Sequence, residues 1–377
     1  MKRMIIDWAT WKYHKKWRQD IFAKYPDPEE AHDWGLQTLE RLQNNSFRSC
    51  VSWLTTVKTD RLAQEVMGLK FNVPGGIAAG FDKDARVIRA LEALGFFVEV
   101  GTVTKHEQAG NDKPRIWRYP EQSALINALG FPSEGMLRVE KRVANLLYKK
   151  EYAPHNPLGI NIGRSKVTSN DDAPQEYVYL INYLFGLGDY FVVNISSPNT
   201  PDLRKLQEGA EELLSRCKKA MQDNGQRFNQ QKPLLVKISP DMNWEQLDKL
   251  LEVCEQIGID GIIAANTTVH REWIDIDDII IIPDRGGLSG CSLLFNRIIL
   301  MVQHIRNLFP NMPLIFVGGI QTPKQAFAAL AYANLFQIYT GFVYNGPFTM
   351  PWLYYGLLDL MNQYGIMNIS EIRDSEI

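Results

Sequence analysis

The feature of this sequence that most constrains its fold is a series of short apolar runs, each ending in small or polar residues, that alternates with longer amphipathic stretches. Apolar runs of strand length separated by helical patterns predict a parallel β-sheet that is covered on both faces. From about residue 71 we find eight such runs: Gly76–Ala79, Phe97–Thr102, Leu158–Gly163, Phe191–Ser196, Leu234–Ser239, Gly261–Thr267, Leu314–Gly319 and Leu335–Gly341. Eight strand–helix units favour an α/β fold of the closed (β/α)₈ type, a TIM barrel, over an open doubly wound sheet, which usually has fewer strands.

Helical patterns fill most of the intervals between these runs. Five stretches have the spacing expected of the intervening helices: Ala85–Leu94, Leu206–Asn224, Trp244–Gln256, Asn296–Leu308 and Thr322–Ala333. The long interval between Thr102 and Leu158 must hold inserted loops as well as a helix.

The N-terminal part of the chain has a different pattern, which predicts helices and loops. Its first stretch is aromatic and amphipathic, with apolar positions at Trp8, Trp11, Trp17, Ile21 and Phe22. A second helix is predicted over Pro26–Leu42, where Pro28 suits the first turn. We therefore divide the chain into an N-terminal helical segment, 1–68, and a barrel, 69–377.

Composition and charge exclude several classes of function. The net charge is −2, which provides no basic field for nucleic acid. The 4 cysteines form no CxxC pair and the 6 histidines show no metal-binding spacing, so we expect no metal site and a reducing compartment. Met1–Thr10 lacks the apolar core of a secretory signal. Because no apolar run reaches about 18 residues, we expect no membrane-spanning helix.

Polar residues gather where the predicted strands end. These ends read AAGFDKD, GTVT, NIGRSK, NISSPNTPDLR, KISPD, NTT, VGGI and YTG, which is more polar than packing requires. In a (β/α)₈ barrel the carboxyl ends of the strands and the loops after them form the active site. The pattern therefore predicts an enzyme.

Two lysines and a set of asparagines indicate the ligand. Lys237 lies inside the apolar run LLVKIS, and Lys83 lies in GFDKD. Each lysine either pairs with a carboxylate or faces an electron-rich ring or an oxyanion. Five asparagines share similar positions: Asn127, Asn161, Asn194, Asn199 and Asn266. One alone would be a loop hydrogen-bonder, but together their amides favour a flat pyrimidine- or flavin-like ligand.

Glycines and a serine complete the predicted site. Gly318-Gly319 and the segment Tyr339–Gly341 follow the last two strands, where barrels often bind phosphate, although such glycines also simply turn the chain. Ser197 in NISSPNT either caps a turn or accepts a proton. No GxSxG motif is present, which argues against acyl transfer by a serine.

The same segments resemble the dihydroorotate dehydrogenase family, in family order and over roughly Ala31 to Phe348: AAGFDKD, EVGTVT, GNDKPR, INALGF, GINIG, NISSPNTPDLR, VKISPD, GGLSG, VGGI and QIYTG. The stretch DPEEAH resembles the helical extension of its membrane-associated, quinone-reducing class. Ser197 agrees with that class, because the soluble class resembles this region but has cysteine as base.

The resemblance implies an activity for this chain. Dihydroorotate would be oxidised to orotate in pyrimidine biosynthesis, with electrons passed through FMN to a membrane quinone. Ser197 would remove the C5 proton while hydride passes from C6 to N5 of FMN. Lys237 would stabilise the reduced flavin, and Lys83 would pair with the carboxylate of orotate.

The resemblance also implies three sets of contacts. FMN would contact Ala79, Gly80, Lys83, Thr102, Asn161, Asn194, Lys237, Ala265, Gly290, Gly319, Tyr339 and Thr340. The substrate would contact Lys83, Asn127, Ala128, Leu129, Gly130, Phe131, Asn194, Asn199, Asn266 and Thr267. The quinone head group would contact His32, Arg118 and Tyr339. The N-terminal helices would form an apolar funnel, and the protein would be peripheral on the cytoplasmic face of a cell membrane.

Two alternatives stay open at this point. One is an FMN barrel of the soluble class, which reduces fumarate or NAD and needs no N-terminal helices. The other is a flavin-binding barrel without turnover that serves as a membrane-docked interaction protein. Ala128 and Pro132, which depart from the family pattern beside the substrate segment, are the only support for the second.

Overall fold

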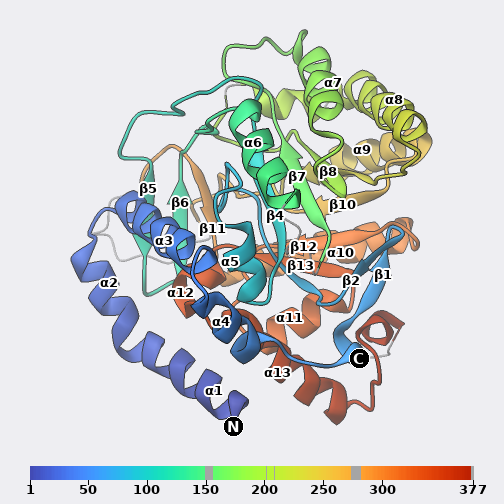
Figure 1. Ribbon diagram of the computed structural model, residues 1–377. Helices are drawn as coiled ribbons and strands as arrows, with labels where there is room; N and C mark the ends of the chain where they lie inside the picture. Colours follow the sequence, from blue (N-terminus) through green and yellow to red (C-terminus); the bar gives the residue numbers. More distant parts are fainter. Residues whose placement is uncertain (149–155, 201, 208, 273–281, 375–377) are drawn as a thin grey trace.

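In the computed structural model, which describes residues 1–148, 156–200, 202–207, 209–272 and 282–374, eight parallel strands close into a barrel (Figure 1). These strands are β3 (Gly75–Ile77), β4 (Phe97–Val103), β7 (Leu158–Ile162), β8 (Tyr190–Asn194), β9 (Leu234–Ile238), β10 (Gly261–Ala264), β12 (Leu314–Val317) and β13 (Leu335–Ile338). Each of the eight predicted runs overlaps one of them, and neighbours in the chain are neighbours in the barrel. The predicted (β/α)₈ fold is confirmed.

Helices surround the barrel. They are α5 (Ile88–Ala93), α6 (Met136–Leu147), α7 (Ala173–Leu184), α8 (Ala210–Phe228), α9 (Trp244–Ile257), α10 (Ser292–Leu308), α11 (Pro323–Leu330), α12 (Thr340–Asn345) and α13 (Thr349–Gln363), with 3₁₀ turns η2 (Asp60–Leu62), η3 (Leu203–Gln207) and η4 (Ile369–Asp374). The start predicted at Ala85 was wrong, because Ala85 has a φ of 58° and the Asp82 carboxylate instead accepts the N–H groups of Arg86 and Val87. The start predicted at Leu206 was also early, because η3 occupies that residue.

The barrel interior has its own apolar core. A hairpin of β1 (Gln64–Val66) and β2 (Leu69–Phe71) precedes the first barrel strand. Phe71 from this hairpin packs on Phe97 and Tyr190, at ring-centre distances of 5.2 and 6.5 Å. A second, larger core lies between the strands and the surrounding helices. Packing therefore fills the lower part of the barrel, and polar side chains occupy the strand ends above it.

The long insert contains strands that the sequence did not predict. β5 (Ile116–Tyr119), β6 (Ala124–Asn127) and β11 (Gly287–Ser289) form an antiparallel sheet of three strands (Figure 1). We expected only loops and a helix between Thr102 and Leu158, and this expectation was incomplete. Asn127, the last residue of β6, pairs in register with Gly287 from a distant part of the chain.

The N-terminal segment packs on the barrel. It comprises α1 (Lys2–Lys12), the π-helix η1 (Tyr13–Trp17), α2 (Arg18–Lys24), α3 (Pro28–Gln43) and α4 (Phe47–Thr55). The Asp27 side chain caps α3 by accepting the N–H of Glu29 at 2.8 Å, and Pro28 occupies its first turn as predicted. Glu29 pairs with Arg115 at 2.7 Å, which joins α3 to the insert.

The boundary of this segment remains open. The boundary that we placed after residue 68 falls in the turn between β1 and β2, and it stays a prediction. Across the described ranges, every helix is too short or too polar to cross a bilayer.

Candidate active site

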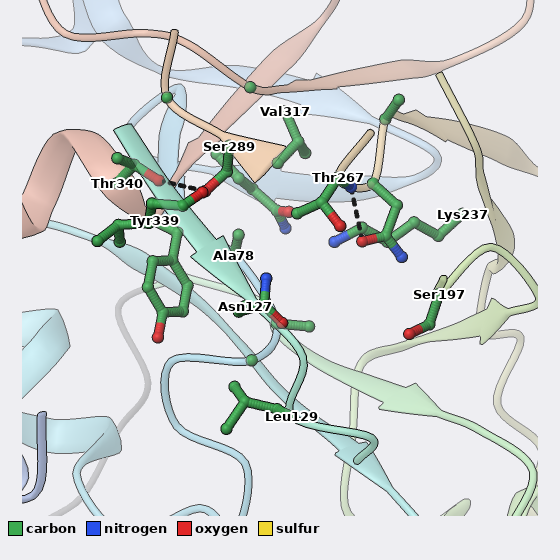
Figure 2. Close-up of a pocket in the computed structure, with 18 of the residues that line it drawn as sticks. Ala78, Asn127, Leu129, Ser197, Lys237, Thr267, Ser289, Val317, Tyr339 and Thr340 are labelled. Carbon is green, nitrogen blue, oxygen red and sulfur yellow. Dashed lines mark hydrogen bonds between the residues drawn. The ribbon is translucent and has the colours of Figure 1, made fainter. Parts of the chain in front are cut away.

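A cavity opens at the carboxyl ends of the barrel strands, where the sequence predicted the site. It is lined by residues from strand ends β3, β4, β8, β9, β10, β12 and β13 and by the three-stranded sheet. Figure 2 shows Ser197 and Lys237 on one side of this cavity, Tyr339 and Thr340 on the other, and Asn127 between them. Of the residues implied to contact FMN or substrate, all except Asn161 and Ala128 line the cavity.

Those two exceptions lie outside the cavity wall. Asn161 is fully buried beneath it, where its Oδ1 accepts a hydrogen bond from Thr102 Oγ1 at 2.7 Å. It therefore supports wall residues from below. Ala128 is buried, and its main chain bonds Arg115 O at 2.8 Å and Asn111 Nδ2 at 3.0 Å. Its methyl group does not line the cavity, so the departure at Ala128 leaves the wall unchanged.

Two lysine ammonium groups reach the cavity from opposite segments. Lys237 in β9 is 4% exposed, and Lys83 follows β3. Burial lowers the pKa of Lys237, and the Glu99 carboxylate opposes that shift. Burial likewise lowers the pKa of Lys83, with Asp84 and Glu29 acting against it. A site with two cations in a low dielectric suits an electron-rich ring and an anionic group.

Four of the five predicted asparagines line this cavity, namely Asn127, Asn194, Asn199 and Asn266. Asn199 Nδ2 donates to Asn127 Oδ1 at 2.9 Å, and Asn266 Nδ2 donates to Ser196 Oγ at 3.0 Å. Asn199 Oδ1 and Thr267 Oγ1 are buried and have no hydrogen-bond partner among the residues that the structure describes. Buried polar atoms without partners are costly, so these two oxygens are suited to a polar ligand.

Ser197 is buried at the edge of the cavity and is 5% exposed. Its Oγ accepts the main-chain N–H of Asn199 at 3.2 Å. A hydrogen bond donated to this oxygen stabilises negative charge on it, which a serine needs in order to accept a proton from carbon.

Glycines form the opposite end of the cavity. Gly290 and Gly319 have φ values of 92° and 70°, a region that favours glycine. A Cβ at Gly290 would lie 2.3 Å from Thr340 Cγ2, and one at Gly319 would lie 2.6 Å from Phe295 Cβ. Neighbouring atoms therefore exclude a side chain at both positions, and the two glycines line this end of the cavity, an arrangement that suits a phosphate.

A second cavity of about 440 Å³ lies between the N-terminal helices and the barrel. Apolar and aromatic side chains from α2, α3 and α12 dominate its wall, and His32, Arg118 and Tyr339 all line it. Tyr339, Ile116 and Leu125 also line the first cavity. These three side chains therefore form a wall that the two cavities share.

The polar groups of the second cavity are held in fixed positions. The His32 ring lies 5.2 Å from Phe81 and 6.4 Å from Tyr339, and its buried Nε2 has no partner within the described part of the chain. Burial, then Lys83 and Arg86, lower the pKa of His32 to about 3, so the ring is neutral. Arg118 donates to Tyr25 O and Pro26 O at 2.6 and 2.8 Å.

Sequence reasoning missed several residues of this region. Glu99 and Gln337 are polar residues inside the apolar runs FVEV and LFQI, the same signal that identified Lys237.

Arg204 follows NISSPNT in sequence and joins three strand-end loops. It donates to Ser196 O at 3.0 Å, to Asp241 Oδ2 at 2.6 Å and to Thr267 O at 2.9 Å. Nothing in the sequence indicated these three partners.

The fold and this site define a (β/α)₈-barrel enzyme with a cavity at its strand ends that suits a planar anionic ligand, next to an apolar cavity under N-terminal helices. The chain belongs to the dihydroorotate dehydrogenase family, whose model matches residues 61–361.

Known proteins from several organisms are similar to most of the chain. The dihydroorotate dehydrogenase (quinone) of Chloroflexus aurantiacus is 43% identical over 85% of this chain and 89% of its own. The Thermus thermophilus protein of the same name is 39% identical over 92% of this chain and 97% of its own. The crystal structure of DHODH from Eimeria tenella in complex with ferulenol has a TM-score of 0.79 and 29% identity, and it covers 95% of this chain and 99% of that one.

Proposed function

We propose that this protein oxidises dihydroorotate to orotate for pyrimidine biosynthesis and passes the electrons through FMN to a membrane quinone. Relatives named dihydroorotate dehydrogenase (quinone) support both the substrate and the acceptor. The observation that carries the proposal is the pair of cavities, one polar and cationic and one apolar, that share the wall of Tyr339, Ile116 and Leu125.

The residues of the first cavity fit FMN. The glycine end, with Gly290 and Gly319, suits the phosphate, and Lys237 suits the electron-rich part of the flavin ring. Once bound, FMN supplies the capacity to accept hydride and pass electrons on. The protein holds the ring and keeps a positive charge beside it.

The other side of the cavity suits dihydroorotate. Lys83 supplies a cation for its carboxylate, and Asn127, Asn199 and Asn266 offer amide groups to its ring. The unpartnered oxygens of Asn199 and Thr267 accept the N–H groups of the pyrimidine in this proposal. Ser197 accepts the C5 proton through Oγ, in a pocket that excludes competing water.

The second cavity suits the quinone, and the outer face of its helices suits a membrane surface. Trp8 and Trp11 on α1 are each 54% exposed, and Lys12, Lys15 and Lys16 follow them. Exposed tryptophans beside lysines are typical of helices that lie in an anionic membrane interface. We propose peripheral attachment on the cytoplasmic face, with the cavity opening toward the lipid.

Anaerobic mixing in two steps tests this function. Dihydroorotate should bleach the flavin absorbance of the FMN-loaded protein, and a quinone added next should restore it. Fumarate and NAD serve as control acceptors and should restore it far more slowly. Protein that binds FMN but is not bleached by dihydroorotate would contradict the proposal, as would equal reoxidation by fumarate.

A further inference from the structure

Glu99 is a carboxylate buried inside the barrel that the mechanism above does not use. It lies on β4 and is 0% exposed. Three side chains from three other strands donate to it. Asn161 Nδ2 bonds Oε1 at 2.9 Å, while Gln337 Nε2 and Tyr190 Oη bond Oε2 at 2.7 and 3.3 Å. A buried charge held by donors from β7, β8 and β13 is strongly oriented.

The hydrogen bond to Asn161 fixes the direction of that amide. Since Nδ2 of Asn161 points to Glu99, its Oδ1 must point to the cavity wall, where it accepts from Thr102 Oγ1 at 2.7 Å and Asn194 Nδ2 at 3.3 Å. Asn194 in turn accepts from Ser196 Oγ at 3.2 Å. One carboxylate below the cavity therefore orders the polar groups along its wall.

Glu99 also acts on the lysine of the site by charge. Its carboxylate raises the pKa of Lys237 against the effect of burial. Lys237 lines the cavity, whereas Glu99 lies below it, so the two charges oppose each other at the ligand. In a low dielectric such charges act on a bound ring over several ångströms.

We propose that Glu99 is a positioning residue that sets the reduction potential of the bound flavin, by fixing the Asn161 amide and by opposing the charge of Lys237. The inference rests on the proposed function, since it needs FMN in this cavity. A negative charge below the cavity would disfavour electron uptake by a flavin bound there, so the native carboxylate holds the potential below the value that Lys237 alone would give.

Two variants that should shift the flavin reduction potential in opposite directions test the inference. Glu99→Gln removes the charge and should move the flavin potential, measured by equilibration with a reference dye, to a more positive value. Tyr190→Phe keeps the Glu99 carboxylate but removes one hydrogen bond that partly neutralises its negative charge. The charge then acts more strongly on the flavin, so the reduction potential should move in the negative direction. Because this second change is nearly isosteric, the test does not depend on the folding of Glu99→Gln.

The controls separate this role from general stability and from the proposed function. Glu176→Gln removes a buried carboxylate on α7, which bonds Ser165 away from the cavity wall, and should leave the potential unchanged. The double variant Glu99→Gln/Gln337→Glu returns a carboxylate to the same contact and should bring the potential back toward that of the native protein.

The inference would be overturned if both single variants had the potential of the native protein, or if Glu176→Gln shifted the potential equally. Failure of the native apoprotein to bind FMN would instead overturn the proposed function.

Discussion

At the scale of single residues, the proposed base is a hydroxyl, which is a weak base in water. The N–H of Asn199 stabilises negative charge on Ser197 Oγ, and burial of Ser197 keeps competing water away. We expect Ser197→Ala to retain FMN but to slow flavin reduction by dihydroorotate about a hundredfold or more, as loss of a general base should. Anaerobic stopped-flow absorbance measures the rate, and an unchanged rate would remove Ser197 from the mechanism.

His32 makes stability depend on pH. The pKa of its folded form is about 3, below its ordinary value of 6.5, because burial disfavours the charged ring. Between these values the unfolded chain binds more protons, so stability present above pH 6.5 is lost as the pH falls toward 3. We expect the free energy of unfolding of the native protein to fall relative to His32→Phe by on the order of 2 kcal/mol from pH 7 to pH 4.5.

Denaturant titrations of both proteins at several pH values measure that difference. A difference that stays constant with pH, or that grows in favour of the native protein at low pH, would show that His32 is not held neutral.

At the scale of elements, Arg204 in η3 ties together the loops after β8, β9 and β10. These loops carry the proposed base and much of the proposed substrate site. A lysine ammonium does not reproduce the planar fork of donors with which the Arg204 guanidinium reaches these three acceptors. We expect Arg204→Lys to raise the KM for dihydroorotate about tenfold, as loss of a charge-assisted hydrogen bond should, with little change in FMN affinity.

The matched control is Arg216→Lys on α8, since Arg216 pairs with the exposed Glu212. Steady-state kinetics and FMN titration of both variants are the measurements. Equal changes of KM in the two variants, or loss of FMN only from Arg204→Lys, would contradict a role in ordering the substrate loops.

The elements also show how far sequence alone reaches. All eight barrel strands were predictable, because strands covered on both faces leave continuous apolar runs. β5, β6 and β11 were not, because they are 3 or 4 residues long and Asn127 pairs with Gly287, more than a hundred residues away. Lys237 was recognised as a polar residue in an apolar run, and Glu99 has the same signature. Arg204 could not be found, because its partners adjoin it only in the fold.

At the scale of the whole molecule, the helices of the N-terminal segment differ in how they pack on the barrel. Leu36 and Leu39 of α3 belong to the main core, and Glu29 pairs with Arg115. In contrast, the buried residues of α1 lie outside that core, and Trp8 and Trp11 are exposed. Truncation before α3 therefore separates the proposed membrane contact from the barrel with less damage than removal of the whole segment.

We expect deletion of residues 1–25 to leave flavin reduction by dihydroorotate near the native rate. Turnover of a long-chain quinone should fall about tenfold or more, because η1 and α2 supply one side of the second cavity. Flotation with vesicles that contain anionic lipid should be lost as well. Intact quinone turnover in the truncated protein would contradict the proposed position of the quinone.

A pair of point variants tests the membrane contact without truncation. Trp11 on α1 and Leu300 on α10 are each 54% exposed, so replacing either by glutamate has a similar effect on folding. Only Trp11→Glu should weaken flotation with anionic vesicles, because its side chain enters the interface in this proposal and that of Leu300 does not. If the two variants float alike, the exposed tryptophans are not the membrane contact, whatever their effect on quinone turnover.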